Sequence, residues 1–145
     1  MDIVIDASVA ILWFVSGEHE AAAQRLLQSH GDLLAPDLLG AEAANTLAKY
    51  VGVGQIPREE ARLAFREILA LMTRIVPMRD LHDEALRLAL DLQHPVYDCY
   101  YLALARRDNG IFVTADKRFM RKLDGTGHER SAIHLSDWRP EEPAA

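Results

Sequence analysis

Acidic side chains stand at the ends of two apolar stretches of the chain. Asp6 directly follows the run 3–5 (IVI), and Asp116 comes two residues after the run 111–114 (IFVT). Unbroken apolar runs are typical of strands buried on both faces of a parallel sheet. Ligands of such sheets bind outside the carboxyl ends of the strands. Either Asp could serve only as a helix N-cap, but two strand ends that both carry Asp favour a shared chemical site.

Two more acids lie on predicted helices. Glu42 has small neighbours in LLGAEAANTL, and Asn45 and Lys49 extend its polar face. Burying a polar group without a hydrogen-bond partner costs roughly 2–7 kcal/mol, and burying an unpaired charge costs more. Glu42 should therefore face solvent or a cation. Asp98 is the only acid in the mostly apolar first turns of the helix 96–108. A solvated helix face for Glu42 and a favourable helix dipole for Asp98 remain the alternatives.

A divalent cation would let these four carboxylates share one pocket. Without it they would repel one another, and at least one would be protonated. Mg²⁺ and Mn²⁺ take oxygen ligands, and Ser8 and Thr114 add hydroxyls that could cap helices or orient a water at the metal. Zinc is not expected, because the histidines show no ligand spacing. Each histidine is expected to be a surface or capping residue: His19, His30, His82, His94, His128 and His134.

Alternating strands and helices must position these residues. Strands are expected at 3–5, 33–35, 74–77, 111–114 and 133–135, and helices at 7–15, 18–30, 38–51, from 57 onward, at 81–92, 96–108 and 116–123. This order predicts an α/β domain with a mainly parallel central sheet of about five strands, covered by helices on both faces. A single domain is expected over 1–138, followed by a flexible, Pro-rich tail over 139–145.

Composition narrows the classes of function. The chain has 145 residues, the size of one domain, and its one cysteine, Cys99, suits a reducing cytosol. Neither a signal peptide nor a membrane-spanning segment is expected. A net charge of −6 argues against nucleic-acid binding through the overall field. A local basic patch could still grip phosphates, and two helices supply its candidates: Arg106, Arg107, Lys117, Arg118, Arg121 and Lys122.

Four segments together resemble the acidic motifs of the PIN domain, and most closely those of VapC-type ribonuclease toxins. They are VIDASVA, APDLLGAEAANTL, YDCYYLALA and VTADKRF, and the resemblance runs from Asp2 to about Trp138. It implies a PIN-like three-layer α/β/α sandwich. It further implies metal ligation by the four acids, with the two hydroxyls in support: Asp6, Glu42, Asp98 and Asp116, with Ser8 and Thr114. Arg118 stands where some PIN nucleases carry a further Asp, which bears on a second metal.

The resemblance implies a Mg²⁺-dependent endoribonuclease that acts as the toxin of a bacterial toxin–antitoxin pair. Its expected partners are an RNA substrate, a cognate VapB-type antitoxin and a second copy of the chain. The helices carry more apolar residues than can be assigned to one sheet face, including Trp13, Phe14 and Phe65. Some of them could line a dimer or antitoxin surface, with core packing as the alternative.

Two other classes of function remain open at this point. Haloacid-dehalogenase-like enzymes and receiver domains also place Asp after the first strand and form an aspartyl-phosphate. The dehalogenase-like pattern needs a second Asp where this chain has Ser8. A module that binds metal or RNA without catalysis would carry the same residues.

Overall fold

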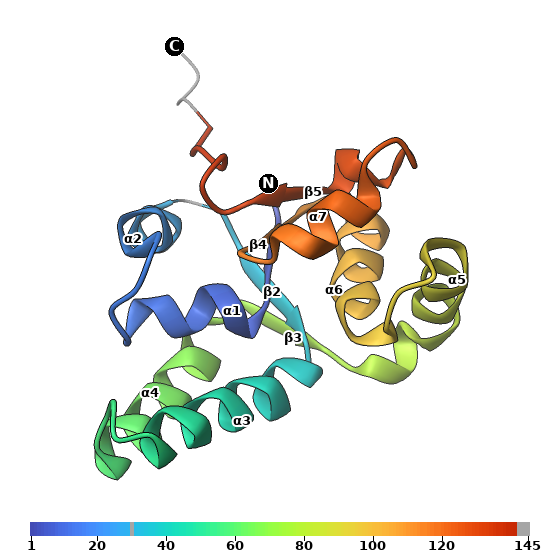
Figure 1. Cartoon of the computed structure of the whole chain (residues 1–145). Helices are drawn as coiled ribbons and strands as arrows, with labels where there is room; N and C mark the ends of the chain where they lie inside the picture. Colours follow the sequence, from blue (N-terminus) through green and yellow to red (C-terminus); the bar gives the residue numbers. More distant parts are fainter. Residues whose placement is uncertain (30, 142–145) are drawn as a thin grey trace.

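Five parallel strands form one sheet in the computed structural model, which describes residues 1–29 and 31–141 (Figure 1). The strands are β1 (Ile3–Ile5), β2 (Leu33–Pro36), β3 (Arg74–Val76), β4 (Ile111–Thr114) and β5 (Ala132–His134). Their order across the sheet is β3-β2-β1-β4-β5. The predicted α/β class and strand number are therefore confirmed. His30 and residues 142–145, predicted to end a helix and to form most of the tail, lie outside the described residues.

Strands are added first on one side of β1 and then on the other, so the strand order switches direction between β1 and β4. From β1 the chain proceeds through β2 to β3, and it then returns to the other side of β1 to add β4 and β5. Ile5 of β1 pairs with Val113 of β4, so the residues after these two stand side by side. Ligand crevices of open α/β sheets form at such a switch point, beyond the carboxyl ends of the strands.

Helices cover both faces of the sheet (Figure 1). They are α1 (Ala7–Ala10), α2 (Glu20–Gln28), α3 (Leu38–Gly52), α4 (Arg58–Leu71), α5 (His82–Leu92), α6 (Val96–Arg107) and α7 (Lys117–Leu123). Most bury one stripe, as α3 does with Leu39, Ala43 and Leu47. By contrast, α6 is buried without a break from residue 99 to 105, because it lies between the sheet and α5. The helix that carries Asp98 is thus the most enclosed one.

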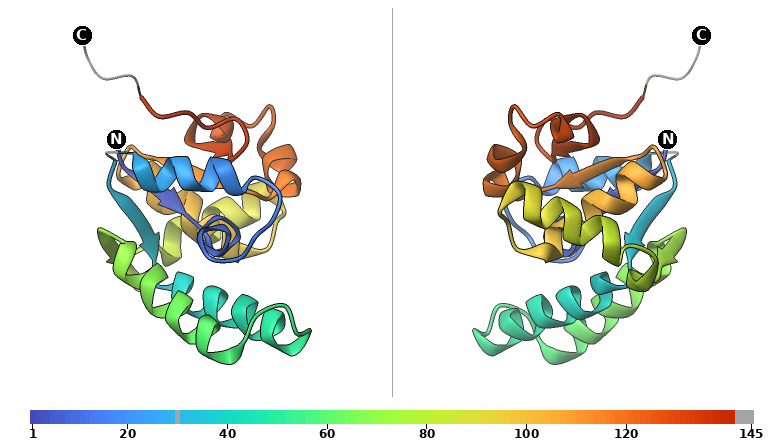
Figure 2. Two further views of the ribbon diagram at one scale, coloured as in Figure 1. Left: turned by 90° about the vertical axis from the view of Figure 1, so that its left-hand side faces the viewer. Right: turned by 90° about the vertical axis from the view of Figure 1, so that its right-hand side faces the viewer.

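The helices α3 and α4 form an antiparallel arm beyond the edge of the sheet. Figure 2 shows this arm, in teal and green, reaching below the remaining layers. A second apolar cluster joins the arm to the turn after α1, with Ile11, Leu47, Ala61 and Ala64 at its centre. This cluster therefore anchors α4 and the C-terminal half of α3 to the segment that follows Asp6.

The segment after Asp6 differs from its prediction. A helix was expected over 7–15, but α1 ends at Ala10 and a 3-10 turn spans Ile11–Trp13. Trp13 is buried, and its Nε1 donates to the carbonyl of Ala23 at 2.9 Å. This bond ties the turn to α2 and makes Trp13 a core residue, so the idea that it lines a partner surface is wrong. None of the described helices is both long enough and apolar enough to cross a membrane.

Candidate active site

The four predicted acids line one pocket of about 850 Å³. It opens beyond the carboxyl ends of β1 and β4, at the switch point of the sheet. Asp6 follows β1 and Asp116 comes after β4, while Glu42 reaches it from α3 and Asp98 from α6. The fold therefore brings together acids that lie up to 110 positions apart in the sequence.

Asp6 is the most deeply buried of the four acids, with 6% of its surface exposed. Oδ1 accepts bonds from the Ser8 hydroxyl at 2.6 Å and from the Val9 amide at 3.2 Å, and Oδ2 accepts from the Thr114 hydroxyl at 2.8 Å. Asp6 is thus both the N-cap of α1 and part of the pocket. The capping and chemical interpretations are compatible.

The two predicted hydroxyls join the ends of β1 and β4. Ser8 Oγ accepts a bond from the Ala115 amide at 3.2 Å in addition to donating to Asp6. The buried Thr114 Oγ1 donates to Asp6 and accepts from the Asp116 amide at 3.1 Å. Both hydroxyls therefore fix the position of Asp6 relative to the loop after β4.

Asp116 also begins a helix. Its Oδ1 accepts from the amides of Arg118 and Phe119 at 2.9 and 3.2 Å, which caps α7. A carboxylate has about four acceptor sites on two oxygens, so Oδ2 retains its acceptor capacity toward the pocket.

Glu42 is held by a tyrosine that the sequence patterns did not reveal. The hydroxyl of Tyr101 donates to Oε1 of Glu42 at 2.5 Å, and Tyr101 itself is fully buried on α6. Its ring stacks on Phe112 of β4, at 5.5 Å between centroids. The strand β4 and the helix α6 thus fix the hydroxyl that orients Glu42. Only a fold that brings residues 59 positions apart together could reveal this contact.

Asp98 has a histidine partner, which the sequence patterns also did not reveal. Nε2 of His94 lies 2.8 Å from Oδ2 of Asp98, and since a carboxylate only accepts, Nε2 is the donor. The side chain of His94 is only 12% exposed and packs against Phe119. His134 is also buried and bonds Ser136 and the Ala115 carbonyl. The expectation that every histidine is a surface or capping residue is wrong for these two, because both rings are largely buried and bond polar groups inside the fold.

Burial raises the pKa of three of the acids. The pKa of Asp6 rises from 3.8 to about 7, since burial outweighs its bonds from Ser8 and Thr114 and the charge of Asp98 adds to the rise. Burial likewise raises the pKa of Glu42, against the bond from Tyr101. It also raises the pKa of Asp98, where His94 opposes the effect and the charge of Asp116 adds to it. These acids therefore repel one another across one pocket.

The donor set of the pocket fits a hard divalent cation. Glu42, Asp6 and Asp116 form no salt bridge with any described Lys or Arg, so their charge is left for a ligand to balance. Within residues 1–29 and 31–141, no three potential ligand side chains lie close enough together to enclose an ion directly. Mg²⁺ suits an open set of this kind, because it usually keeps several waters and uses one or two carboxylates.

The basic candidates divide into two groups. Lys117, Arg118 and Arg121 line the acidic pocket, and Lys122 lies just beyond it. Arg106 and Arg107 do not line it, so their predicted place near the site is wrong. They lie at the far end of α6, about 12 Å or more along the helix axis from Asp98. There Arg106 pairs with Glu84 and Arg107 with Asp108.

Comparisons with known proteins agree with the fold. Residues 3–125 match the family described as PIN domain. Ribonuclease VapC3 of Pyrobaculum aerophilum is 29% identical over 125 residues, which cover 85% of this chain and 95% of the relative.

Solved structures share the fold. A crystal structure of a protein from P. aerophilum superposes with a TM-score of 0.70 at 23% identity, covering 94% of this chain and 85% of the other. A toxin–antitoxin complex from Klebsiella pneumoniae gives 0.63 at 16% identity, covering 92% and 97%. VapBC2 from Rickettsia felis, bound to a DNA fragment from its promoter, gives 0.59 at 14% identity, covering 83% and 92%.

Proposed function

The chain belongs to the PIN-domain family, and from this premise we propose that it is a Mg²⁺-dependent endoribonuclease that hydrolyses RNA phosphodiesters. One observation carries the proposal: four carboxylates from separate elements line one pocket and have no basic partner there beyond His94 among the described residues. The name of the P. aerophilum relative, a ribonuclease, supports RNA as the substrate.

The four acids would share one task, which is to hold the metal. Asp6, Glu42, Asp98 and Asp116 would bind Mg²⁺, with Mn²⁺ as a substitute. When bound, the ion would supply Lewis-acid activation of water and stabilise charge on the phosphate and the leaving oxygen.

The protein's own contribution is to fix the carboxylates before substrate arrives. The hydroxyls of Ser8 and Thr114 fix Asp6, the Tyr101 hydroxyl fixes Glu42, and the His94 ring fixes Asp98. Each of these four hydrogen bonds is no longer than 2.8 Å between donor and acceptor. Three of the four carboxylates are therefore held in fixed orientations before a cation binds.

We further propose that the chain is the toxin of a VapBC-type pair, with a VapB-type antitoxin as partner. Two solved structures with the same fold, the K. pneumoniae toxin–antitoxin complex and R. felis VapBC2, support this assignment. A homodimer in the cytoplasm belongs to the same proposal. Phe14 and Phe65 stay candidates for a partner surface, since both are only partly buried against the core.

RNA cleavage by the purified chain tests the activity. We expect cleavage with Mg²⁺ and none in EDTA, and Asp6→Asn should abolish it while the circular dichroism spectrum is retained. Full activity of Asp6→Asn or of the EDTA-treated protein would refute the metal mechanism. Acid-stable labelling of Asp6 by a phosphate mimic would favour the aspartyl-phosphate alternative instead.

A further inference from the structure

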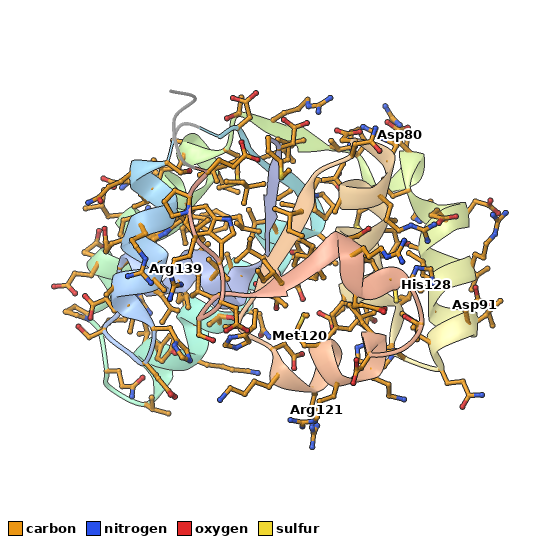
Figure 3. The ribbon with its side chains drawn as sticks, turned by 90° about the horizontal axis from the view of Figure 1, so that it is seen from above. Asp80, Asp91, Met120, Arg121, His128 and Arg139 are labelled. Atoms are coloured by element: carbon orange, nitrogen blue, oxygen red, sulfur yellow. The ribbon has the colours of Figure 1, made fainter. Side chains whose placement is uncertain are left out.

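A second hollow, which we call the basic groove, lies beside the acidic pocket. It has a volume of about 540 Å³ and lies between the α5–α6 connection and α7. The connection contributes Gln93, His94 and Pro95, and α7 contributes three cationic side chains: Arg118, Arg121 and Lys122. Figure 3 shows Arg121 projecting outward from α7. No acidic residue of the described chain lines this groove.

The groove is continuous with the acidic pocket. Arg118 and Arg121 line both hollows, so a molecule in the acidic pocket could extend past them into the groove. His94 lines the groove and bonds Asp98, which lines the pocket. The two hollows are therefore adjacent parts of one surface with opposite charge.

The cations of the groove are not engaged in ion pairs. Within the described residues, no salt bridge includes Arg118, Arg121 or Lys122, whereas Arg74, Arg106 and Arg107 all have acidic partners. The Nζ of Lys122 donates to the Gln93 carbonyl at 3.2 Å, which fixes the side chain and leaves two of its three donors for a ligand. None of the three charges is neutralised by an ion pair among the described residues, and that of Lys122 is also held in place.

We propose that the basic groove binds the backbone phosphates of the RNA strand next to the phosphodiester in the acidic pocket. This proposal rests on the proposed ribonuclease function. A protein of net charge −6 repels a polyanion overall, so the strand needs local cations close to the cut. Guanidinium groups bind phosphate through paired donors, and a lysine binds it as a point charge. A phosphate strand that occupies the acidic pocket would reach these groups next.

Binding of a fluorescein-labelled single-stranded oligouridylate tests the proposal. Every protein carries Asp6→Asn, so that the RNA stays intact in Mg²⁺, and affinity is measured by anisotropy over a range of salt concentrations. Arg121→Gln with Lys122→Gln should weaken binding by at least tenfold at low salt. The slope of log K against log[salt] should fall in magnitude by about 1.4, since each phosphate contact on a single strand contributes about 0.7.

The matched control removes two charges elsewhere. Arg58→Gln with Arg66→Gln lies on the exposed side of α4, outside both hollows, and should retain affinity and slope. Arg121→Lys with Lys122→Arg keeps the charge and should retain binding, which separates charge loss from misfolding. Equal losses in both glutamine pairs, or no loss in either, would overturn the proposal.

Two further measurements separate the possible failures. If the chain without substitutions cleaves RNA but the variant with Arg121→Gln and Lys122→Gln (the groove pair) binds RNA as tightly as before, the groove proposal alone fails. If the chain does not cleave RNA, the ribonuclease proposal fails, whatever the binding data show. Poly-L-glutamate serves as the protein-like probe. If the groove pair lowers the affinity for poly-L-glutamate and leaves the affinity for RNA unchanged, the groove binds an acidic protein segment and our proposal is wrong.

Discussion

The two ends of α6 differ in how their charged side chains are paired. At the C-terminal end each basic side chain has an acid beside it. Arg106 pairs with Glu84 at 3.2 Å, and Asp108 receives bonds from Arg107 at 2.9 Å and from Arg74 at 2.6 Å. These pairs are partly exposed, and pairs of this kind contribute about 0–1 kcal/mol each.

At the N-terminal end, Asp98 faces other acids instead. Its neighbours include Asp6, Glu42 and Asp116, and among the described residues its one polar side-chain partner is His94. Burial and like charge raise the pKa values of Asp6, Glu42 and Asp98. The metal-free pocket therefore disfavours the ionised carboxylates that a cation would bind. The comparison teaches that paired charges at one end serve the fold, while uncompensated charges at the other end mark the site.

The largest expected effect comes from removing an acid at the N-terminal end. Asp98→Asn should lower RNA cleavage by roughly a hundredfold or more, since loss of residues that only orient ligands already costs about 10–100-fold. Arg107→Gln, at the other end of the same helix, should leave the rate unchanged. Initial rates on one RNA substrate check both, and a similar loss in the two variants would remove the distinction between the ends.

A second expected effect concerns the residue that orients Glu42. Tyr101→Phe removes one hydroxyl and should weaken Mn²⁺ binding by about 10–100-fold. Isothermal titration measures the affinity without relying on turnover. Tyr97→Phe is the matched control, because Tyr97 lies on the same helix and is 58% exposed. Unchanged Mn²⁺ affinity in Tyr101→Phe would show that the bond to Glu42 is not needed.

The dependence of stability on pH should follow the acids of the pocket. Folded Asp6 has a pKa of about 7, against an ordinary value of 3.8, so the folded protein binds this proton more tightly than the unfolded chain does. Stability of the metal-free protein should therefore be highest below about pH 4 for this group and fall as the pH rises toward about 7. Urea unfolding in EDTA at pH 5 and pH 8 measures the difference.

Asp6→Asn tests the origin of that pH dependence. The variant should lose most of the fall in stability between the two pH values, because Asn does not titrate. At pH 8 its melting temperature should rise, by roughly 3 °C for each kcal/mol gained. A fall of the same size in the variant would place the titrating group elsewhere.

The smallest expected effect lies at the paired end of α6. Arg74→Ala removes one of the two partners of Asp108 and should lower the free energy of unfolding by about 0.5–1 kcal/mol. Cleavage should not change. Urea unfolding and initial rates check the two statements, and a loss of activity with intact stability would connect this end of the helix to the site.

Local patterns predicted the strands and the four acids, but not the contacts that position them. The run 111–114 forms β4 with the predicted bounds, because an apolar strand buried on both faces is visible in the sequence. Asp6 and Asp116 could be found for the same reason, as each stands at the end of such a run. What remained open was which helix face meets which strand.

Long-range packing decides those remaining contacts. Tyr101 is one of three tyrosines within five positions, and only the packing of α6 on the sheet selects it as the partner of Glu42. Arg106 and Arg107 were expected near the site and lie far from it. The length of α6 places them at the opposite end of the helix from Asp98, which lines the pocket. The turn that follows α1 is likewise tied to a distant carbonyl, which Trp13 bonds and which no local pattern reveals.

Asp6 and Asp116 each begin a helix as well as line the pocket, and this double duty constrains how variants should be designed and how the chain can evolve. Alanine at either position would remove a cap worth about 0.5–2 kcal/mol, so an alanine scan would mix unfolding with lost chemistry. Asparagine caps helices about as well as aspartate, so it separates the two. A lineage that gave up the chemistry could therefore drift to asparagine at these positions and keep its shape.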